Sequence, residues 1–318
     1  MSDPEVAVVI ATRDREQRLA FALEALAAQS LPAERFEVVV VRAAGARGPH
    51  AEPPPGLRVR FLDSDHAAPA AQRNEGWRAT SAPLVAFTDD DCRPEPGWLE
   101  ELLAAAVPGA VVQGRTAADP AEAHLLYGLA RTIEVSGPTP WGETCNIAYP
   151  RELMERLCGF DESFPRAWGE DTDLFLRARE AGATLEFAPG AVVRHAVVRR
   201  TLRQAIREAA RYDAIPLLVA RHPEHRRTFP APGLVKTSHA TLVLAFAGAL
   251  AARRRPVLGV ALGAPYVLAA LRTHLATNPV SAPSLARLAL HLPAPVAVET
   301  AEVIATVRGA IRNRVAMI

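Results

Sequence analysis

Short apolar runs alternate with amphipathic stretches over the first part of the chain. Four short runs predict strands, and the first is a continuous apolar run rich in β-branched residues, as a strand covered on both faces requires. These runs lie at residues 6–11, 38–41, 58–62 and 84–88. Leu19, Leu23 and Leu26 recur at helical spacing, and residues 70–79 also favour a helix. Strands that alternate with helices predict an α/β fold with a mostly parallel, Rossmann-like sheet and helices on both faces.

The pattern loosens farther along the chain but still predicts further elements. Helices are expected near residues 98–106, 151–157 and 171–181, and strands near residues 111–114, 185–187 and 191–194. Residues 201–222 favour a basic helix, and two uncharged runs follow at residues 237–252 and 256–271. The pattern therefore predicts an α/β domain over residues 1–200 and a helical, basic and apolar C-terminal part over residues 201–318.

Charge separates the two halves of the sequence more sharply than the net charge of +1 indicates. Residues 1–188 hold 18 basic and 30 acidic side chains, a net charge of −12, and residues 189–318 hold 18 basic and 5 acidic ones, a net charge of +13. This difference favours phosphates or an anionic membrane as the surroundings of the second part.

The two uncharged runs have the composition of membrane-seeking helices but not the length of membrane spans. Each contains 16 residues, or about 24 Å of helix, against a hydrocarbon core of about 30 Å. Arg253, Arg254 and Arg255 separate them. We expect helices that lie in or dip into the cytoplasmic leaflet, joined by the amphipathic residues 298–318. The alternatives are a helical domain packed on the first one and a dimer interface.

The N-terminus and the cysteines favour a cytoplasmic protein. The first residues carry acids and lack a basic segment followed by an apolar one, so no signal peptide is predicted. Cys92, Cys145 and Cys158 show no metal-ligand spacing and predict neither a disulfide framework nor a zinc site. We expect a protein at the inner face of the cell membrane.

Asp89, Asp90 and Asp91 directly follow the predicted strand at residues 84–88. If the backbone stays extended, Asp89 and Asp91 point to one side and Asp90 to the other. Two carboxylates on one side form a hard oxygen site suited to Mg²⁺ or Mn²⁺, which can also hold a diphosphate. The alternative is a solvated acidic turn that caps the following helix.

Two other candidates have strong structural explanations when they are taken alone. Glu170 and Asp171 open a predicted helix, where acids complement the helix dipole. His195 follows a predicted strand, and a single histidine in that place is more often packed or exposed than a ligand.

Taken together, these segments resemble the inverting family 2 glycosyltransferases of the GT-A fold, which carry an Asp-x-Asp metal motif. The matching blocks occur in order at residues 8–15, 71–76, 87–91, 145–146, 159–162 and 169–174. The resemblance implies a hexosyltransferase-type enzyme that moves a sugar from a nucleotide diphosphate to a hydroxyl acceptor with inversion, using Mn²⁺ or Mg²⁺. It further implies that Asp89, Asp91 and His195 hold the cation and that Asp171 is the general base.

The resemblance also indicates which side chains contact the donor and substrate. These are Thr12, Asp14, Arg73, Asp89, Asp90, Trp168 and Glu170. Thr12 and Asp14 are the candidates for the nucleoside, and Trp168 for stacking on a sugar. The chain departs from the family after its second strand, where Arg42 follows in place of the usual acid. The base of the donor is therefore left open.

A glycan or lipid-linked hydroxyl acceptor in cell-envelope synthesis is expected, with a membrane surface as partner and no nucleic acid. Two alternatives remain open. A nucleotidyltransferase would need a glycine-rich loop after its first strand, which residues 12–15 lack. A non-catalytic GT-A-like scaffold would be favoured by loss of the acids, yet Asp89, Asp91 and Asp171 are all present.

Overall fold

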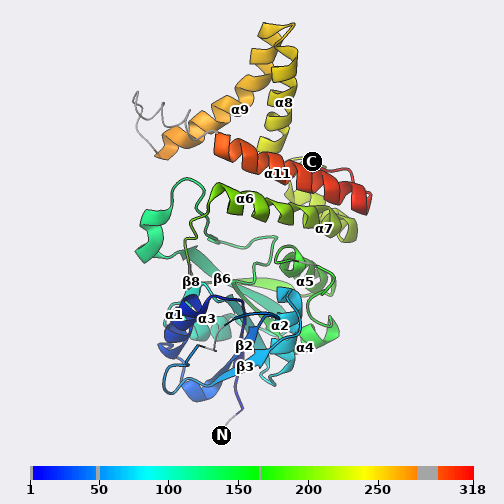
Figure 1. Cartoon of the computed structure of the whole chain (residues 1–318). Helices are drawn as coiled ribbons and strands as arrows, with labels where there is room; N and C mark the ends of the chain where they lie inside the picture. The colour runs from blue at the N-terminus through cyan, green and yellow to red at the C-terminus, as the bar shows by residue number, and fades with distance from the viewer. Residues whose placement is uncertain (1–2, 48–50, 165, 278–292) are drawn as a thin grey trace. The chain divides into compact units, whose positions relative to one another are not determined.

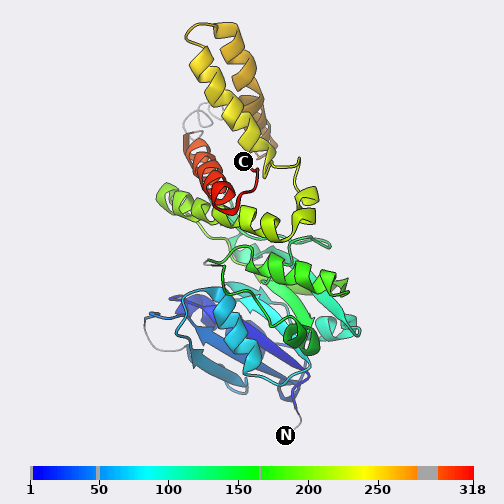
Figure 2. The same cartoon turned by 90° about the vertical axis from the view of Figure 1, so that its right-hand side faces the viewer.

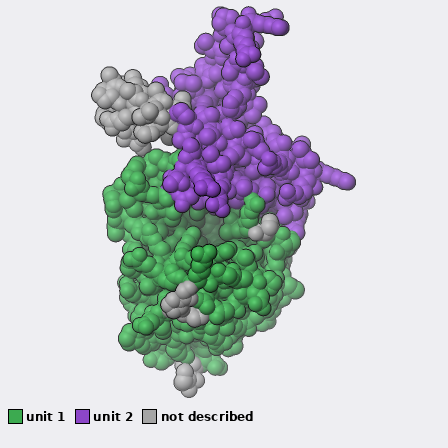
Figure 3. All heavy atoms as spheres, viewed as in Figure 1, with its two compact units in different colours: residues 1–199 green, residues 200–318 purple. Residues whose placement is uncertain are grey.

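A computed structural model describes residues 3–47, 51–164, 166–277 and 293–318 of the chain. The chain divides into two compact units, which are coloured separately in Figure 3. Unit 1 comprises residues 1–199 and contains the sheet, and unit 2 comprises residues 200–318 and is helical (Figure 1).

Unit 1 is built on one eight-stranded sheet. Its strands are β1 (Val6–Thr12), β2 (Phe36–Arg42), β3 (Val59–Asp63), β4 (Leu84–Asp89), β5 (Cys92–Pro94), β6 (Ala110–Ala118), β7 (Asn146–Pro150) and β8 (Thr184–His195). Their order across the sheet is β3-β2-β1-β4-β7-β6-β8-β5. Neighbouring strands are parallel except at β4–β7, β6–β7 and β5–β8. The predicted α/β fold with a mostly parallel sheet is confirmed.

Helices cover both faces of this sheet, as the sequence predicts. The helices of unit 1 are α1 (Glu16–Ala27), η1 (Ala33–Arg35), α2 (Pro69–Arg78), α3 (Trp98–Ala105), η2 (Pro120–Leu125), α4 (Arg151–Arg156) and α5 (Glu170–Glu180). One apolar core contains Leu23 of α1 and Leu99 of α3, and the other contains Trp77 of α2 and Leu174 of α5. The central strands β1, β2 and β4 are apolar on both sides because each side faces one of these cores.

The register of the central strands determines where polar side chains meet. In the parallel pairs, Ala11 of β1 lies opposite Asp89 of β4, and Thr12 lies opposite Arg42 of β2. The carboxyl ends of β1, β2 and β4 therefore share one edge of the sheet, where ligands bind in open α/β folds.

The far half of the sheet differs from the sequence-based expectation. Residues 185–187 and 191–194, predicted as two short strands, belong to the single strand β8, whose register with β6 shifts at Gly114. A Cβ on Gly114 would lie 2.4 Å from the Ala191 carbonyl oxygen, so the shift requires glycine. Strands β5 and β7 were not predicted, because runs of three and five residues are too short for an apolar pattern to emerge.

Unit 2 consists of helices packed around its C-terminal helix. They are α6 (Leu202–Ala209), η3 (Ala210–Ala214), α7 (Ile215–Arg221), η4 (Pro223–Thr228), α8 (Thr237–Ala251), α9 (Pro256–Thr277) and α11 (Pro293–Asn313). The single basic helix predicted over residues 201–222 is wrong, because the 3₁₀ turn η3 interrupts it. Pro216 lacks the N–H that an unbroken α-helix would bond to the carbonyl of Tyr212, so the chain tightens there.

Helix α11 packs on α6, η3 and α7, while α8 and α9 form a hairpin that projects from this layer (Figures 1 and 2). The uncharged runs predicted as helices correspond to α8 and α9. None of the helices in the described part of the chain is both long and apolar enough to cross a membrane.

Candidate functional site

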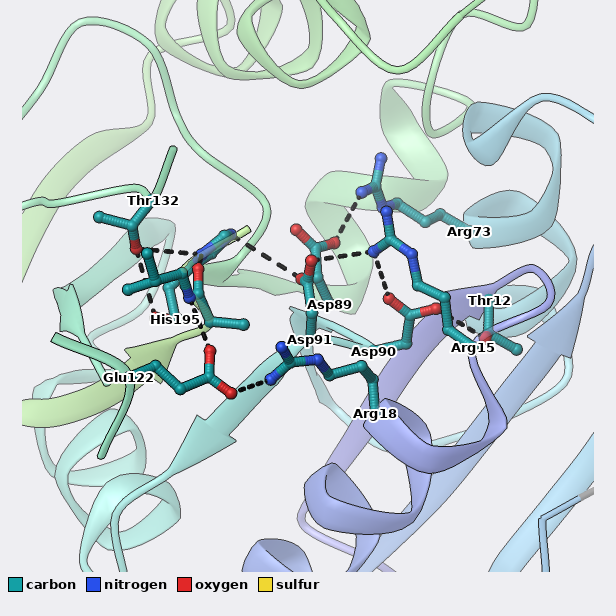
Figure 4. Close-up of polar contacts among 12 residues, drawn as sticks. Thr12, Arg15, Arg18, Arg73, Asp89, Asp90, Asp91, Glu122, Thr132 and His195 are labelled. Carbon is teal, nitrogen blue, oxygen red and sulfur yellow. Dashed lines mark hydrogen bonds and ion pairs between the residues drawn. The ribbon is translucent and has the colours of Figure 1, made fainter. Parts of the chain in front are cut away.

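The three consecutive aspartates lie where β4 ends and the chain turns into β5 (Figure 4). The backbone is not extended here, as the sequence-based argument assumed, because residues 90 and 91 form a turn. Asp90 nevertheless points away from the other two, toward Thr12 at the end of β1. Asp89 and Asp91 share one side, so the predicted pairing of these carboxylates holds for a different local reason.

Asp89 and Asp91 meet His195, the last residue of β8, and Cys92, the first residue of β5. Each of the four residues offers one possible ligand atom, and these atoms all lie within 4.8 Å of one another. The antiparallel register of β5 and β8 places Cys92 directly opposite His195. Two segments that are distant in sequence, residues 89–92 and the end of β8, therefore meet at the carboxyl edge of the sheet.

Hydrogen bonds fix the orientation of the His195 ring. Its Nδ1 lies 2.8 Å from the carbonyl oxygen of Ala196 and 3.3 Å from the hydroxyl of Thr132. A proton on Nδ1 donates to that carbonyl, which leaves the lone pair of Nε2 facing the aspartates. Nε2 lies 3.8 Å from Oδ1 of Asp91. Metal-binding histidines are commonly oriented by such a bond from the ring nitrogen that does not bind the metal.

Cys92 is the member of this group that sequence reasoning missed. Its spacing to the other cysteines gave no signal, and its position directly after Asp91 was the sequence feature that could have included it. The side chain is fully buried in the apolar core below the turn. Burial, reinforced by the nearby Cys145, Asp89 and Asp91, raises the pKa of the Cys92 thiol well above its ordinary value. The sulfur is therefore a neutral thiol at physiological pH.

Asp90 links the turn to the loop after β1. Its carboxylate accepts a hydrogen bond of 2.7 Å from the Thr12 hydroxyl and one of 2.9 Å from Arg15, which also donates to Asp91 at 2.9 Å. Burial raises the pKa of Asp90 to about 6 even though Arg15 opposes the shift. Thr12 and Asp90, both predicted donor contacts, thus hold each other in place.

Arg73 of α2 joins the aspartate turn to the start of α5. The guanidinium donates to Asp89 at 3.0 Å and to Glu170 at 2.8 Å. It is buried, and burial alone would lower its pKa, but Asp89 and Glu170 outweigh that effect and raise it. One fixed cation therefore connects two acidic segments that lie far apart in the sequence.

Asp171 follows Glu170 in the first turn of α5. Its carboxylate accepts a hydrogen bond of 2.8 Å from the backbone N–H of Thr172, and no ion pair with a cation is recorded for it among the residues described. Burial and the neighbouring Glu170 raise the pKa of Asp171 far above that of an ordinary carboxyl, and Arg73 only partly opposes them. Asp171 is thus the carboxyl of the site best suited to take up a proton.

The helix start that carries these acids depends on a glycine. Gly169, at φ 91°, precedes α5 in a conformation that favours glycine. The turn lets the backbone N–H of Trp168 donate to Glu170 at 2.6 Å. Trp168 itself is half-buried beside the acids.

Asp14 is the predicted donor residue that the structure places apart from the aspartate turn. It is exposed, it adopts φ 52°, and its carboxylate accepts a hydrogen bond of 2.7 Å from the backbone N–H of Arg47. It therefore shapes the loop after β1 rather than joining the group around Asp91.

The donor set fits a divalent cation. Two carboxylates supply hard oxygen ligands of the kind that Mg²⁺ and Mn²⁺ take, and an imidazole nitrogen with a free lone pair favours Mn²⁺. A neutral thiol adds little to either ion. Asp89, Asp91 and His195 are accordingly the side chains suited to hold such an ion.

The sheet order and the acidic turn at its carboxyl edge define a protein of the GT-A fold. A mannosyltransferase of Pyrobaculum calidifontis, solved with GDP-Man and Mn²⁺, superimposes with a TM-score of 0.53 at 20% identity, over 99% of this chain and 88% of that one. A Staphylococcus aureus TarS structure with UDP-GlcNAc gives a TM-score of 0.50 at 14% identity, over 98% and 92%. These likenesses concern the fold.

Sequence comparison then identifies the family. Residues 7–132 match the family described as Glycosyl transferase family 2, and residues 85–297 match Glycosyl transferase family group 2. The chain belongs to the family 2 glycosyltransferases, as its motifs predicted.

Curated relatives match over part of their length. The pre-mycofactocin glycosyltransferase of Mycobacterium tuberculosis is 34% identical over 52% of this chain and 38% of its own length. The validoxylamine A glucosyltransferase of Streptomyces hygroscopicus is 29% identical over 56% of this chain and 49% of its own length. The alignments thus span about half of these relatives or less.

Proposed function

We propose that this chain is an inverting glycosyltransferase of the hexosyltransferase type, which uses a divalent cation and a nucleotide-diphosphate sugar. The observation that carries the proposal is the bridge that Arg73 makes between Asp89 and Glu170. It brings a cation-binding group and a protonatable carboxyl, Asp171, to one site. A transferase needs these two functions together, one for the leaving group and one for the acceptor.

The leaving-group side consists of Asp89, Asp91 and His195. A Mn²⁺ or Mg²⁺ ion bound there supplies positive charge that stabilises the departing nucleotide diphosphate. Arg73, held between two carboxylates, adds a fixed positive charge near the same phosphates. Preorganised charges of this kind lower the barrier because they need no rearrangement as negative charge develops.

The acceptor side consists of Asp171 in its ionised form. Asp171 takes the proton of the acceptor hydroxyl while the hydroxyl oxygen forms a bond to the anomeric carbon. The bond from that carbon to the diphosphate oxygen breaks in the same step, and its electron pair leaves with the diphosphate. A single displacement inverts the configuration and needs one carboxylate near the acceptor.

The nucleoside side lies at the ends of β1, β2 and β3. Thr12 and Asp14 are the proposed nucleoside contacts, Asp90 orients Thr12, and Trp168 lies beside Glu170 on the sugar side. Arg42 stands where an acid is usual in the family, and it donates to Asp63 at the end of β3 at 2.7 Å. Asp63, on the next strand, is therefore the acid that we propose for contact with the base of the donor.

The acceptor is a glycan or a lipid-linked hydroxyl compound, and the enzyme works at the inner face of the cell membrane in envelope synthesis. The support for this part of the proposal is the net charge of +13 over residues 189–318, which favours an anionic surface. A polar sugar donor made in the cytoplasm and a lipid-linked acceptor meet only at such a surface.

Nucleotide release from a panel of UDP-, GDP- and dTDP-sugars, with Mn²⁺ and after chelation, tests the proposal. We expect release of a nucleoside diphosphate from at least one donor, and its loss with chelator. The Asp91→Ala variant should lose Mn²⁺ binding and turnover together, whereas Asp65→Asn, an exposed acid on a loop, should retain both.

Two outcomes would contradict the proposal. Release of pyrophosphate from a nucleoside triphosphate would indicate a nucleotidyltransferase. Donor binding in thermal-shift measurements, without turnover for any acceptor or water, would indicate a non-catalytic scaffold. Thermal shift is informative here because a ligand that binds only the folded state raises the melting temperature.

A further inference from the structure

The α8–α9 hairpin of unit 2 exposes an apolar surface that is unusual for a protein in water. Large apolar side chains on both helices face outward, with exposed fractions of 74% for Leu250, 81% for Val257 and 72% for Val260. Val243, Leu244, Phe246, Leu258, Val267 and Leu268 are also exposed. Contiguous exposed apolar surface on this scale marks an interaction site.

The contact between the two helices is made by small residues instead. A Cβ on Gly248 of α8 would lie 2.8 Å from the carbonyl oxygen of Gly259 of α9, and a Cβ on Gly259 would lie 2.6 Å from the Cβ of Ala252. The backbones therefore approach closely, and the large side chains are left on the outside. Helix pairs in membranes pack in this way, because apolar surroundings give no reason to bury large side chains.

Polar contacts hold the base of the hairpin on α11. Glu302 of α11 bonds Nε2 of His239 at 3.1 Å and the ammonium of Lys236 at 2.7 Å, at the start of α8. His239 is fully buried. The hairpin is thus a fixed part of unit 2, and its outer portion projects from the other helices (Figure 2).

The charges on the hairpin indicate what covers its apolar face. Arg253, Arg254 and Arg255 form the exposed tip, and the sequence between Glu224 and Glu299 contains no acidic residue. A second copy of the hairpin would supply no acidic partner for these arginines. An anionic lipid surface supplies both acyl chains for the apolar side chains and phosphates for the arginines.

The length of the hairpin determines how it lies. Helix α8, the shorter of the two, has 15 residues, or about 22 Å, against a hydrocarbon core of about 30 Å, whereas α9 has 22 residues, or about 33 Å. Entry tip first would carry three arginines toward the membrane centre, at a cost of about 2.5–3.5 kcal/mol each. A hairpin lying along the interface keeps the arginines at the phosphates.

We infer that the α8–α9 hairpin lies in the interface of an anionic bilayer, with its apolar face among the acyl chains and its arginine tip at the lipid phosphates. This inference rests on the proposed function in one respect: it assigns the membrane contact of the proposed enzyme to the α8–α9 hairpin. The binding of the hairpin to lipid does not depend on the transfer reaction.

Flotation of the full chain with vesicles tests this inference. The wild type should float with vesicles of phosphatidylglycerol and phosphatidylcholine, and weakly with phosphatidylcholine alone. An arginine near an anionic surface is worth about fivefold in partitioning, so the triple variant R253Q/R254Q/R255Q should bind about 100-fold more weakly. V257D/V260D should weaken vesicle binding by a similar factor, about tenfold for each side chain.

Matched changes in unit 1 serve as controls. Val107→Asp alters an exposed valine of unit 1, with an exposed fraction of 47%, and R47Q/R156Q/R179Q removes three surface arginines outside the hairpin. Neither variant should change flotation. Equal binding to both vesicle types, or no loss in the hairpin variants, would overturn the inference. The inference would also be overturned if the wild type failed to float and formed a dimer in light scattering, and if V257D/V260D were a monomer. A second copy of the chain would then cover the apolar face of the hairpin.

The catalytic proposal can fail separately. Nucleotide release in detergent-free buffer with a soluble acceptor should be unchanged in V257D/V260D, because these residues lie outside the proposed site. If the chain floats with vesicles but releases no nucleotide, the lipid-binding role of the hairpin is supported and the proposed transfer reaction is wrong.

Discussion

Two groups of acids face each other in unit 1, and their surroundings differ. The turn after β4 holds Asp90 and Asp91 against Arg15 and Asp89 against Arg73, so its negative charges are largely balanced. At the start of α5, Glu170 pairs with Arg73, while Asp171 accepts hydrogen bonds from the backbone N–H and the hydroxyl of Thr172 and forms no ion pair among the residues described. The acids of the turn are thus paired with arginines, whereas burial and Glu170 raise the pKa of Asp171.

The difference indicates a division of chemical work. Carboxylates next to cations keep their charge and suit the binding of a metal ion, whereas a carboxyl without a cation holds its proton more tightly and suits proton transfer. Environments that separate the pKa values of nearby acids commonly define their roles in catalysis.

Asp171→Asn should give the largest effect. The amide keeps the shape and the contact with Thr172 but cannot accept a proton, so turnover should fall by about 10³-fold, within the range for loss of a general base. Donor binding should change little, because the leaving-group side is intact. Steady-state kinetics and calorimetry with a donor sugar measure the two quantities.

Glu180→Gln, at the exposed far end of α5, is the matched control and should turn over normally. A normal rate in Asp171→Asn would remove Asp171 from the role of base. An equal loss of donor binding and turnover would indicate that the carboxylate binds the donor instead.

Arg73→Gln should disturb both acid groups at once. It removes the single cation between Asp89 and Glu170, and breaking such a buried pair costs about 3–5 kcal/mol. We expect a marked fall in the free energy of unfolding, measured in urea, and weaker donor binding. Arg73→Lys retains the positive charge but cannot bond both carboxylates at once as a guanidinium does, so we expect an intermediate loss of stability. Full stability in Arg73→Gln would contradict the bridging role.

The comparison also predicts how stability depends on pH. The pKa of Asp171 is raised in the folded protein, so the folded state binds its proton more tightly than the unfolded state does. Its contribution is most favourable below the unfolded pKa of about 3.9 and is lost as pH rises through the higher folded pKa. Because Asn does not titrate, Asp171→Asn should gain on the wild type with rising pH, by about 1–3 kcal/mol at pH 8.

Urea denaturation of both proteins from pH 4 to pH 8, without added metal, measures this gain. Asp90, whose pKa is also raised, is present in both and cancels in the difference. A gap between the proteins that stays constant with pH would mean that the pKa of Asp171 is ordinary.

The sequence was sufficient for the elements around the site and for the family, because the strands that carry the motifs are long and apolar. Val6–Thr12 and Leu84–Asp89 are buried on both faces, and such runs are hard to mistake. Where the sheet turns antiparallel, the signal fails. Pro94 ends the three-residue strand β5, and Asn146 begins β7, so neither strand displays an apolar pattern.

The partners of the site residues were beyond the reach of sequence reasoning. His195 joins the group around Asp91 because β5 and β8 pair in antiparallel register, and the spacing of residues along the sequence does not reveal a register between distant strands. Arg73 likewise meets Glu170 only through the packing of α2 and α5 at one edge. The acids themselves were recognisable by type and position, but their protonation depends on neighbours that the fold supplies.

The smallest expected effect concerns Arg15. Replacing Arg15 should change the charge beside Asp91 but hardly change the stability of the fold. Its side chain is 49% exposed while it bonds Asp90 and Asp91, and such half-exposed pairs contribute about 0–1 kcal/mol. Arg15→Gln should therefore hardly change the free energy of unfolding in urea.

The same variant should, however, free Asp91 and raise the Mn²⁺ affinity of the donor-free protein, by about tenfold or less, since a nearby positive charge repels the ion. Calorimetric titration with Mn²⁺ measures the change, and Arg47→Gln is the surface control. A lower affinity in Arg15→Gln would mean that Arg15 positions Asp91 for the metal ion and does not compete with it. The arginine would then be a positioning residue of the acidic turn and not a source of balancing charge.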